Sequence, residues 1–254
     1  MDRIIEKIKE KYELRSLPNS LIKSVLTEYL LKNRIKDFNS EKEMKIIIKD
    51  VRAKLRRYTG QYASKSNIKA REKLIKNHQI SKLLEQHTST RERIEDYPLI
   101  KKVIEDISPK SILDLGCGLN PLAISSQKSY YYAYDINNND LEIVKEYFRI
   151  NKIEGETHHE DIRVVSSFPN TDLCLIFKVL DILGDNKTKI TKDLLTKIKS
   201  RFLIISFATN TLSGRPMNNP YRNWFERILN SLNYNYEIRR TKQEIFYLIN
   251  KQSV

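Results

Sequence analysis

The chain has 254 residues and is 40% hydrophobic, which allows a packed core in one large domain or two smaller ones. With only 6 glycines and 7 prolines, long disordered tracts are not expected. Apolar runs such as residues 173–177 are too short to span a bilayer, and the charged N-terminus has no signal-peptide core. The 2 cysteines favour a reducing compartment without disulfides, and no Cys/His cluster has metal-ligand spacing. We therefore expect a cytoplasmic protein without a metal or a membrane partner.

The net charge of +14 is unevenly spread along the chain. Residues 51–82 contain ten basic residues and one acid. A run of charge is often only a solvated face, but this density is typical of a surface that binds a polyanion such as a nucleic acid. The side chains that we expect to contact RNA phosphates are Arg52, Lys54, Arg56, Arg57, Lys69, Arg71, Lys73 and Lys76.

The first hundred residues have the apolar periodicity of helices. Two helices are predicted within residues 2–32, a third over 40–58 and a fourth over 67–84. Ser40 with Glu43, and Ser89 with Glu92, fit capping boxes. The second box would place Arg91 and Arg93 in the first turn of a further helix. Such cations oppose the helix dipole, so they would face either an anionic ligand or neighbouring acids.

From residue 108 the pattern changes to alternating strands and helices. Strands are predicted at 111–115, 130–135, near 157–161, 172–180 and 202–207, with helices between them. Residues 234–239 and 245–249 are predicted to form a terminal hairpin. This order predicts an α/β fold with a seven-stranded sheet. We place the boundary between an all-helical domain, residues 1–105, and the α/β domain, residues 106–254, near Pro98 and Pro109.

The segment ILDLGCGLNPLA, residues 112–123, joins a buried strand to a tight turn. Gly116 and Gly118 flank Cys117 there, and glycine lets the backbone approach a ligand closely. The next strand ends at Asp135, about 20 residues further on, where a nucleotide-binding α/β unit places an acid on the ribose hydroxyls. An ordinary turn in another doubly wound domain is the alternative.

Three segments resemble one family when taken together. HTSTRERI at 87–94, LDLGCGLNPLA at 113–123 and SFATNTLSGR at 206–215 are similar, in this order, to segments of the aminoglycoside-resistance 16S ribosomal RNA methyltransferases (Arm-type). Members of that family have a class I, Rossmann-like methyltransferase domain behind a basic helical domain. They transfer a methyl group from S-adenosylmethionine (SAM) to N7 of a guanine in the decoding site of the small ribosomal subunit. Two departures are Ala208, where the family has proline, and Asn210, where it has arginine.

The resemblance assigns roles to individual residues. Arg93, helped by His87 and Ser89, would hold the SAM carboxylate. The glycine turn would pass beneath the methionine portion, and Asp135 would bind the ribose. The remaining cofactor contacts that it implies are Tyr62, Cys117, Ile136, Asp161, Ile162 and Phe177, and Arg215 would contact RNA. The partner would be 16S-type rRNA in the small subunit, bound by a monomer.

The implied chemistry requires no catalytic side chain. Guanine N7 carries a free lone pair, so positioning would supply most of the catalysis and no general base is expected. Two alternatives stay open. The chain could methylate another RNA base, such as adenine at N1, which the replacement of the family arginine by Asn210 favours. It could also be a non-catalytic RNA-binding assembly factor, which the intact glycine turn and Asp135 disfavour.

Overall fold

A computed structural model describes residues 2–35, 40–59, 68–184, 186–211 and 215–251. The first helices are α1 (Asp2–Lys9), α2 (Asn19–Lys32) and α3 (Glu41–Thr59), with a short 3-10 turn at Tyr12–Leu14. Their apolar faces enclose a core of their own that extends from Ile4 to Leu55. The capping box at the start of α3 is confirmed, because the Glu43 amide donates to Ser40 Oγ at 3.1 Å and the Ser40 amide to Glu43 Oε2 at 3.4 Å.

The single helix predicted over residues 67–84 is wrong. The chain forms α4 (Ile68–Lys76) and α5 (Ile80–Gln86), separated by His78 in the left-handed region at φ 55°. The Gln79 amide donates to the carbonyl of Leu74 at 2.8 Å, which closes the end of α4. This break turns α5 out of line with α4, so that both can pack on the α/β domain.

The predicted capping box at Ser89 is also wrong. Helix α6 (Thr88–Glu92) already begins at Thr88, so Ser89 lies inside it and Arg91 lies in its last turn. Arg93 follows the helix end, and α7 (Tyr97–Ile107) begins four residues later. The arginines therefore do not oppose a helix dipole, and their environment is decided by tertiary contacts.

The seven-stranded sheet predicted from the sequence is confirmed. Its strands are β1 (Ser111–Leu115), β2 (Tyr130–Asp135), β3 (Gly155–His159), β4 (Leu173–Phe177), β5 (Phe202–Ala208), β6 (Asn235–Arg240) and β7 (Glu244–Asn250). They are arranged in the order β3-β2-β1-β4-β5-β7-β6, and β7 is antiparallel to both of its neighbours. The first five strands are parallel, so their carboxyl ends meet at one edge.

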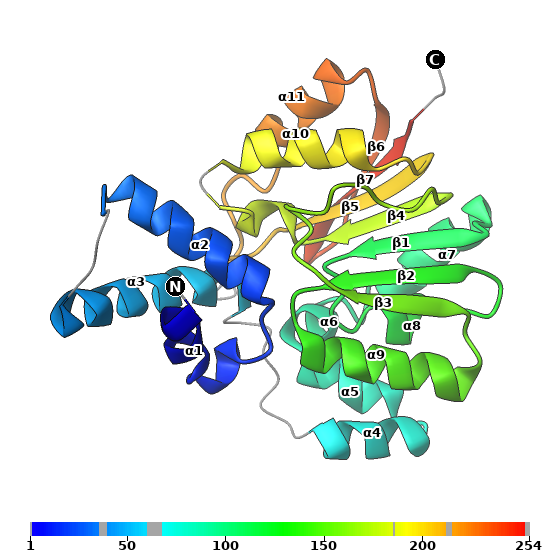
Figure 1. The fold of residues 1–254 in the computed structure, drawn as a ribbon. Coiled ribbons are helices and arrows are strands. Elements are labelled where there is room, and N and C mark those ends of the chain that lie inside the picture. The colour runs from blue at the N-terminus through cyan, green and yellow to red at the C-terminus, as the bar shows by residue number, and fades with distance from the viewer. Residues whose placement is uncertain (1, 36–39, 60–67, 185, 212–214, 252–254) are drawn as a thin grey trace.

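Helices cover both faces of this sheet (Figure 1). On one face lie α4, α5, α7, α8 (Pro121–Ile124) and α9 (Asn138–Asn151), and on the other lie α10 (Lys187–Lys197) and α11 (Asn223–Ser231). Successive residues of β4 alternate between the two cores, with Leu175 in the first and Ile176 in the second. Burial on both faces explains why this strand reads as a continuous apolar run.

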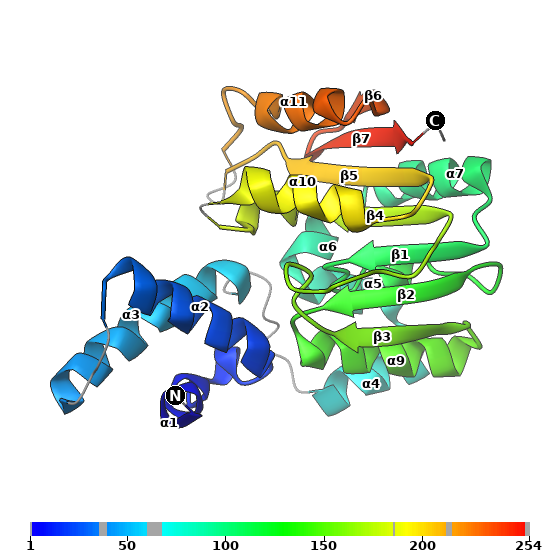
Figure 2. The same ribbon diagram turned by 45° about the horizontal axis from the view of Figure 1, so that its top comes forward.

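The hydrophobic cores divide the chain earlier than the predicted boundary at residue 105. Ile75, Leu83 and Tyr97 pack in the same core as the strands, so α4 to α7 belong to the α/β domain. The separate helical bundle comprises only α1 to α3, and it lies off the carboxyl ends of the parallel strands (Figures 1 and 2). Pro98 lies in the first turn of α7 and Pro109 follows its end, so both belong to the larger domain and not to a linker. Within the residues described, no helix combines the length and apolar character needed to cross a membrane.

Candidate active site

A cavity lies at the carboxyl ends of the parallel strands, where the helical bundle faces the sheet. Its walls come from the loops after β1, β2, β3 and β4, from the α5–α6 junction, and from Glu13, Ser16 and Tyr58 of the bundle. Ten of the twelve predicted cofactor residues line it: His87, Ser89, Gly116, Cys117, Gly118, Asp135, Ile136, Asp161, Ile162 and Phe177. Tyr62 lies outside the described residues, and Arg93 is not part of the lining.

The glycine turn after β1 depends on the missing Cβ atoms. Gly116 and Gly118 have φ of +72° and +50°, which side chains of L-residues rarely allow. A Cβ on Gly116 would lie 2.4 Å from Val179 Cγ2, and one on Gly118 would lie 3.1 Å from His87 Cε1. The two glycines thus let the loop pack against its protein neighbours on the cavity wall. Removing either would displace His87 or Val179, both of which line the same cavity.

Asp135 fixes the turn and keeps capacity for a ligand. One carboxylate oxygen accepts from the Gly118 amide and the other from the Asn137 amide, each at 2.8 Å. A carboxylate has about four lone-pair sites, so acceptor capacity remains for a hydroxyl donor in the cavity. Burial, followed by the negative charge of Asp140, raises the pKa of Asp135 to about 6. The acid is therefore ionised at neutral pH and titrates not far below it.

The loop after β3 carries a compact ionic cluster that sequence analysis did not find. Arg163 pairs with Asp161, with Nη2 2.7 Å from Oδ2. It also donates to the hydroxyl of Tyr58 at 2.9 Å and lies over that ring at 4.7 Å. Tyr58 comes from α3, so this cluster connects the bundle to the cavity wall. Neither Tyr58 nor Arg163 has a local sequence signal for this role, because the contact spans 105 residues.

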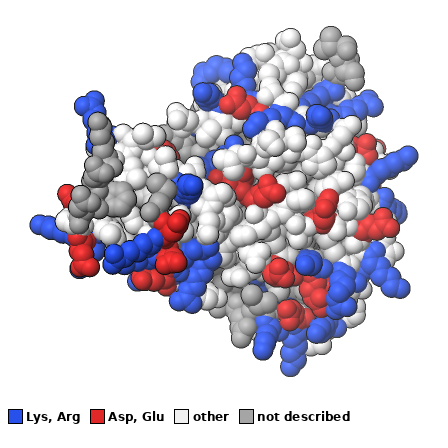
Figure 3. Space-filling model, viewed as in Figure 1, with Lys and Arg blue, Asp and Glu red and all other residues white. Residues whose placement is uncertain are grey.

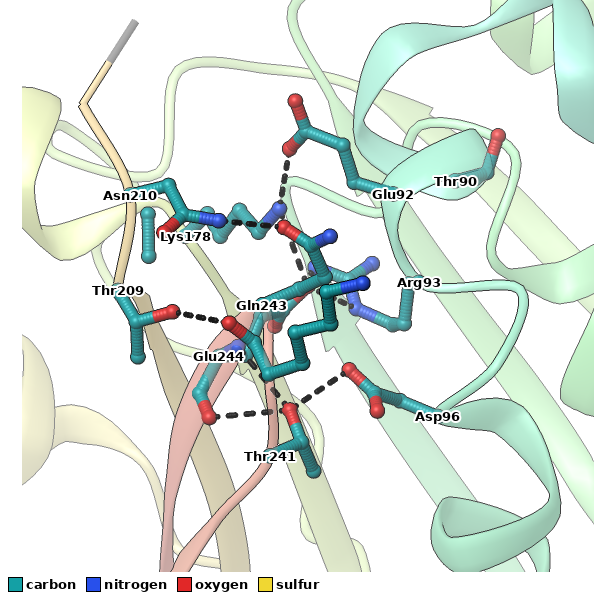
Figure 4. A network of polar contacts seen from close by, with 12 residues as sticks. Thr90, Glu92, Arg93, Asp96, Lys178, Thr209, Asn210, Thr241, Gln243 and Glu244 are labelled. Atoms are coloured by element: carbon teal, nitrogen blue, oxygen red, sulfur yellow. Dashed lines mark hydrogen bonds and ion pairs between the residues drawn. The ribbon is translucent and has the colours of Figure 1, made fainter. Parts of the chain in front are cut away.

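The buried network in Figure 4 shows where Arg93 lies. Arg93 is fully buried, with Nε 2.9 Å from Glu244 Oε1, and Nη1 donates to Asn120 Oδ1 at 2.7 Å. Lys178, which follows β4 with φ of 59°, pairs with Glu92 at 2.6 Å and with Glu244 at 3.1 Å. Lys178 lines the cavity, whereas Arg93 lies outside its lining and is held by Glu244 and Asn120. The expected contact of Arg93 with a ligand carboxylate stays a prediction.

The polar and apolar groups that line the cavity fit the expected cofactor. The Asp135 carboxylate adjoins the glycine turn in the cavity, and Phe177 and Ile162 add apolar surface. Over the described ranges, no group of three or more His, Cys, Asp or Glu side chains is placed to hold a metal ion. The arrangement is that of a site for a nucleoside-bearing molecule.

Comparison with protein families decides what kind of protein has this site. The model of the FmrO family, described as ribosomal RNA methyltransferase, matches residues 70–248, which is well over half of the chain. The chain belongs to the FmrO family of ribosomal RNA methyltransferases. The matched range begins within α4, in agreement with the division between the core of the helical bundle and the cores of the α/β domain.

Relatives of this FmrO-family chain include enzymes named 16S rRNA (guanine(1405)-N(7))-methyltransferase. The one from Serratia marcescens is 27% identical over 244 residues, and the comparison covers 93% of each chain. The one from Proteus mirabilis is 29% identical over 142 residues, which is 53% of this chain and 50% of that one. The crystal structure of the 16S rRNA methyltransferase RmtF in complex with S-adenosyl-L-homocysteine is similar, with a TM-score of 0.83 at 22% identity. It covers 99% of this chain and 98% of RmtF, and at this identity the likeness shows the fold.

The residues expected to bind RNA fall into three groups in the structure. Lys69, Lys73, Lys76 and Arg215 are exposed, and the bottom of Figure 3, where α4 lies, shows basic side chains with acidic ones among them. Arg52, Lys54 and Arg56 form ion pairs within the bundle, with Glu10 at 3.4 Å, Glu28 at 3.7 Å and Glu13 at 2.8 Å. The side chain of Arg57 lies outside the described part.

Arg71 corrects the expectation of an evenly basic helix face. Its side chain is only 1% exposed, and its Nη2 lies 2.7 Å from Asp140 Oδ1. Arg71 is on the face of α4 that packs on α9, so RNA phosphates cannot reach it. Charge counting could not separate Arg71 from its exposed neighbours, because the acid that binds it lies 69 residues away.

Proposed function

We propose that this protein transfers a methyl group from SAM to N7 of the guanine that corresponds to G1405 in the 16S rRNA of the small ribosomal subunit. The family membership makes the chain a ribosomal RNA methyltransferase. The names of the relatives from Serratia marcescens and Proteus mirabilis support the target base. The observation that carries the proposal is the cavity at the sheet edge, in which the glycine turn and Asp135 meet.

The residues of the cavity divide the work of holding the cofactor. Asp135 would accept hydrogen bonds from the ribose hydroxyls, and Ile162 and Phe177 would contact the adenine. Asp161, neutralised by Arg163, would frame the adenine without adding net charge. Bound SAM supplies an electrophilic methyl group on its sulfonium. The chain itself has to hold guanine N7 in line with that methyl group, which is catalysis by orientation.

The cysteines fit a mechanism without a protein nucleophile. Burial raises the pKa of the Cys117 and Cys174 thiols well above the usual value, so both stay protonated at neutral pH. Cys174 lies within β4 and is fully buried. A thiolate that attacks the base, as cytosine-C5 methylation requires, is therefore not provided by either residue.

The exposed cations favour a large folded RNA as the substrate. We infer that Lys69, Lys73 and Lys76 of α4 contact phosphates, since this helix presents them to solvent. Such contacts fix the register of the RNA and leave base selection to the cavity. A ribosomal substrate also supports a cytoplasmic location, and a monomer would suffice for this arrangement.

One observation favours a second candidate, methylation of an adenine. Asn210, at the position of the family arginine, donates from Nδ2 to Gln243 Oε1 at 2.7 Å and is shown in Figure 4. A neutral amide that is already engaged does not replace an arginine as a charged hydrogen-bond donor to guanine O6. Mapping of the methylated base therefore decides between guanine and adenine.

The direct test is methyl transfer from tritiated SAM to purified ribosomal particles. We expect label in the RNA of small subunits and none in that of large subunits. The Asp135→Asn variant serves as the control that should lose transfer at limiting SAM. Small subunits that remain unlabelled by a folded protein would contradict the proposal and favour a non-catalytic assembly factor.

A further inference from the structure

Arg71, which is not available to RNA, ends at a buried carboxylate behind the cofactor cavity. Asp140 is 1% exposed and lies in the first turn of α9, directly after the loop that follows β2. Its Oδ1 accepts from Arg71 Nη2 at 2.7 Å, and its Oδ2 accepts from Asn137 Nδ2 at 2.6 Å. His87 Nε2 stands 3.7 Å from the same Oδ2. One carboxylate thus gathers groups from α4, the α5–α6 junction and the β2–α9 loop.

Each of these groups except Arg71 lies on the cavity wall. The Asn137 amide donates to Asp135 at 2.8 Å, so the position of Asn137 sets that of the ribose acid. His87 packs against Gly118, whose amide donates to the other oxygen of Asp135. Asp140 therefore supports Asp135 from two sides, through Asn137 and through His87.

The charge of Asp140 needs a partner, and Arg71 supplies it. The ionisable groups around Asp140 are Arg71 from α4, His87 from the α5–α6 junction, Asp135 at the end of β2 and Cys117 after β1. Burial lowers the pKa of His87, so its imidazole is neutral at neutral pH. A buried carboxylate that loses its cation is strongly destabilised and repels Asp135.

We propose that Arg71 is a positioning residue for cofactor binding, acting through Asp140 to hold Asn137, His87 and Asp135 in the geometry that receives the ribose of SAM. This inference rests on the proposed function, because it takes SAM as the ligand. It assigns α4 two opposite faces. The exposed face carries Lys69, Lys73 and Lys76, while the buried face supports the cofactor site.

The test compares Arg71→Met with Lys73→Met, a loss of an exposed cation two residues away on the same helix. SAM affinity is measured by calorimetry between about pH 6 and pH 8. We expect R71M to weaken SAM binding by about tenfold or more, and K73M to leave it unchanged. We also expect the pH midpoint of binding to move upward in R71M, because the uncompensated Asp140 opposes ionisation of Asp135. Saturating SAM should restore kcat on small subunits, so the defect appears in the KM for SAM.

Two further variants separate positioning from a general loss of structure. R71M/D140N removes both charges, and the amide oxygen introduced at position 140 can still accept from Asn137. The double variant should therefore recover most of the SAM affinity lost in R71M. If R71M does not fold, Arg71→Lys takes its place. This variant keeps the charge without the planar fork, and it should show a smaller loss of SAM affinity. Wild-type affinity in folded R71M or R71K, or no recovery in the double variant, would overturn the inference. Wild-type protein that binds no SAM would instead contradict the proposed function.

Discussion

At the scale of single residues, Asp135, which we propose binds the ribose of SAM, combines two demands that oppose each other. It must be buried enough to hold the glycine turn, and it must be ionised to accept ribose hydroxyls. The Gly118 and Asn137 amides favour the ionised form, whereas burial and Asp140 disfavour it. The outcome is a pKa of about 6, above the ordinary value for an aspartate and below neutral pH.

SAM affinity should accordingly depend on pH in one direction. As the pH falls through about 6, Asp135 takes up a proton and loses acceptor capacity, so affinity should fall; above that value it should level off. Asp135→Asn should weaken binding by about 1.5–3 kcal/mol at pH 8 and abolish the pH dependence. Calorimetry across this range provides the measurement. A D135N protein that binds SAM as tightly as the wild type would show that Asp135 does not contribute to SAM binding.

Also at this scale, the sequence could identify the residues of the cavity but not their partners. The DLGCG turn and the acid at the end of β2 are local signals, and both lie in the cavity. The ion pair of Arg93 could not be predicted, because Glu244 lies 151 residues away near the other end of the chain, and the contact of Arg93 with SAM stays a prediction. Periodicity and motif spacing carry no information about such pairs.

At the scale of elements, the bundle and the sheet meet through a few polar contacts beside the cavity. Tyr58 of α3 reaches Arg163 after β3. His159 Nε2, at the end of β3, lies 2.8 Å from the Ser16 carbonyl and 3.0 Å from that of Ile136, so this nitrogen carries the proton and donates. Both contacts involve loops that line the cofactor cavity, so packing of the bundle and shape of the cavity depend on each other.

Loss of Arg163 should therefore affect the whole fold. Its side chain is 12% exposed and that of Asp161 is 4% exposed, so Arg163→Met leaves a buried carboxylate without its cation. We expect a loss of about 3–5 kcal/mol in the free energy of unfolding. Urea denaturation measures it, with Arg149→Met, which removes an exposed ion pair, as a control that should be unchanged. Equal stability of the two variants would show that the cluster does not hold the bundle in place.

Element boundaries were predicted well wherever one local pattern decides them. The strands and the long helix α9 agree within a few residues, because apolar alternation and capping act locally. The break between α4 and α5 was missed since His78 adopts a left-handed conformation without a glycine to mark it. The sequence could not show that α4 to α7 pack with the sheet, because they are as helical as the bundle and only their packing distinguishes them.

At the scale of the whole molecule, the charge of +14 is divided between internal pairs and exposed lysines. Arg52 and Arg56 are engaged by acids of the bundle, so they are poorer candidates for RNA contact than charge counting suggests. The lysines of α4 remain exposed. Affinity for the small subunit should thus decrease steeply with salt, by roughly 0.7–0.9 in the log–log slope for each phosphate contact.

Reversing Lys69, Lys73 and Lys76 to glutamate should weaken binding to small subunits and lower that slope by roughly 2–3. SAM binding should be unchanged, because none of these side chains lines the cavity. The matched control reverses Lys101, Lys102 and Lys110, which are also exposed but belong to α7 and to the loop before β1. Filter binding across a salt series compares the two proteins. If both lose the same affinity, α4 has no particular role in docking.

The measurement that tests the central claim most directly is the identity of the methylated atom. Small subunits treated with the protein and SAM are divided between borohydride–aniline cleavage, which cuts RNA at N7-methylguanine, and primer extension, which stops at N1-methyladenine. The account predicts one cleavage site, at the guanine that corresponds to position 1405 in the names of the relatives, and no new stop. A stop at an adenine without cleavage at that guanine would contradict it.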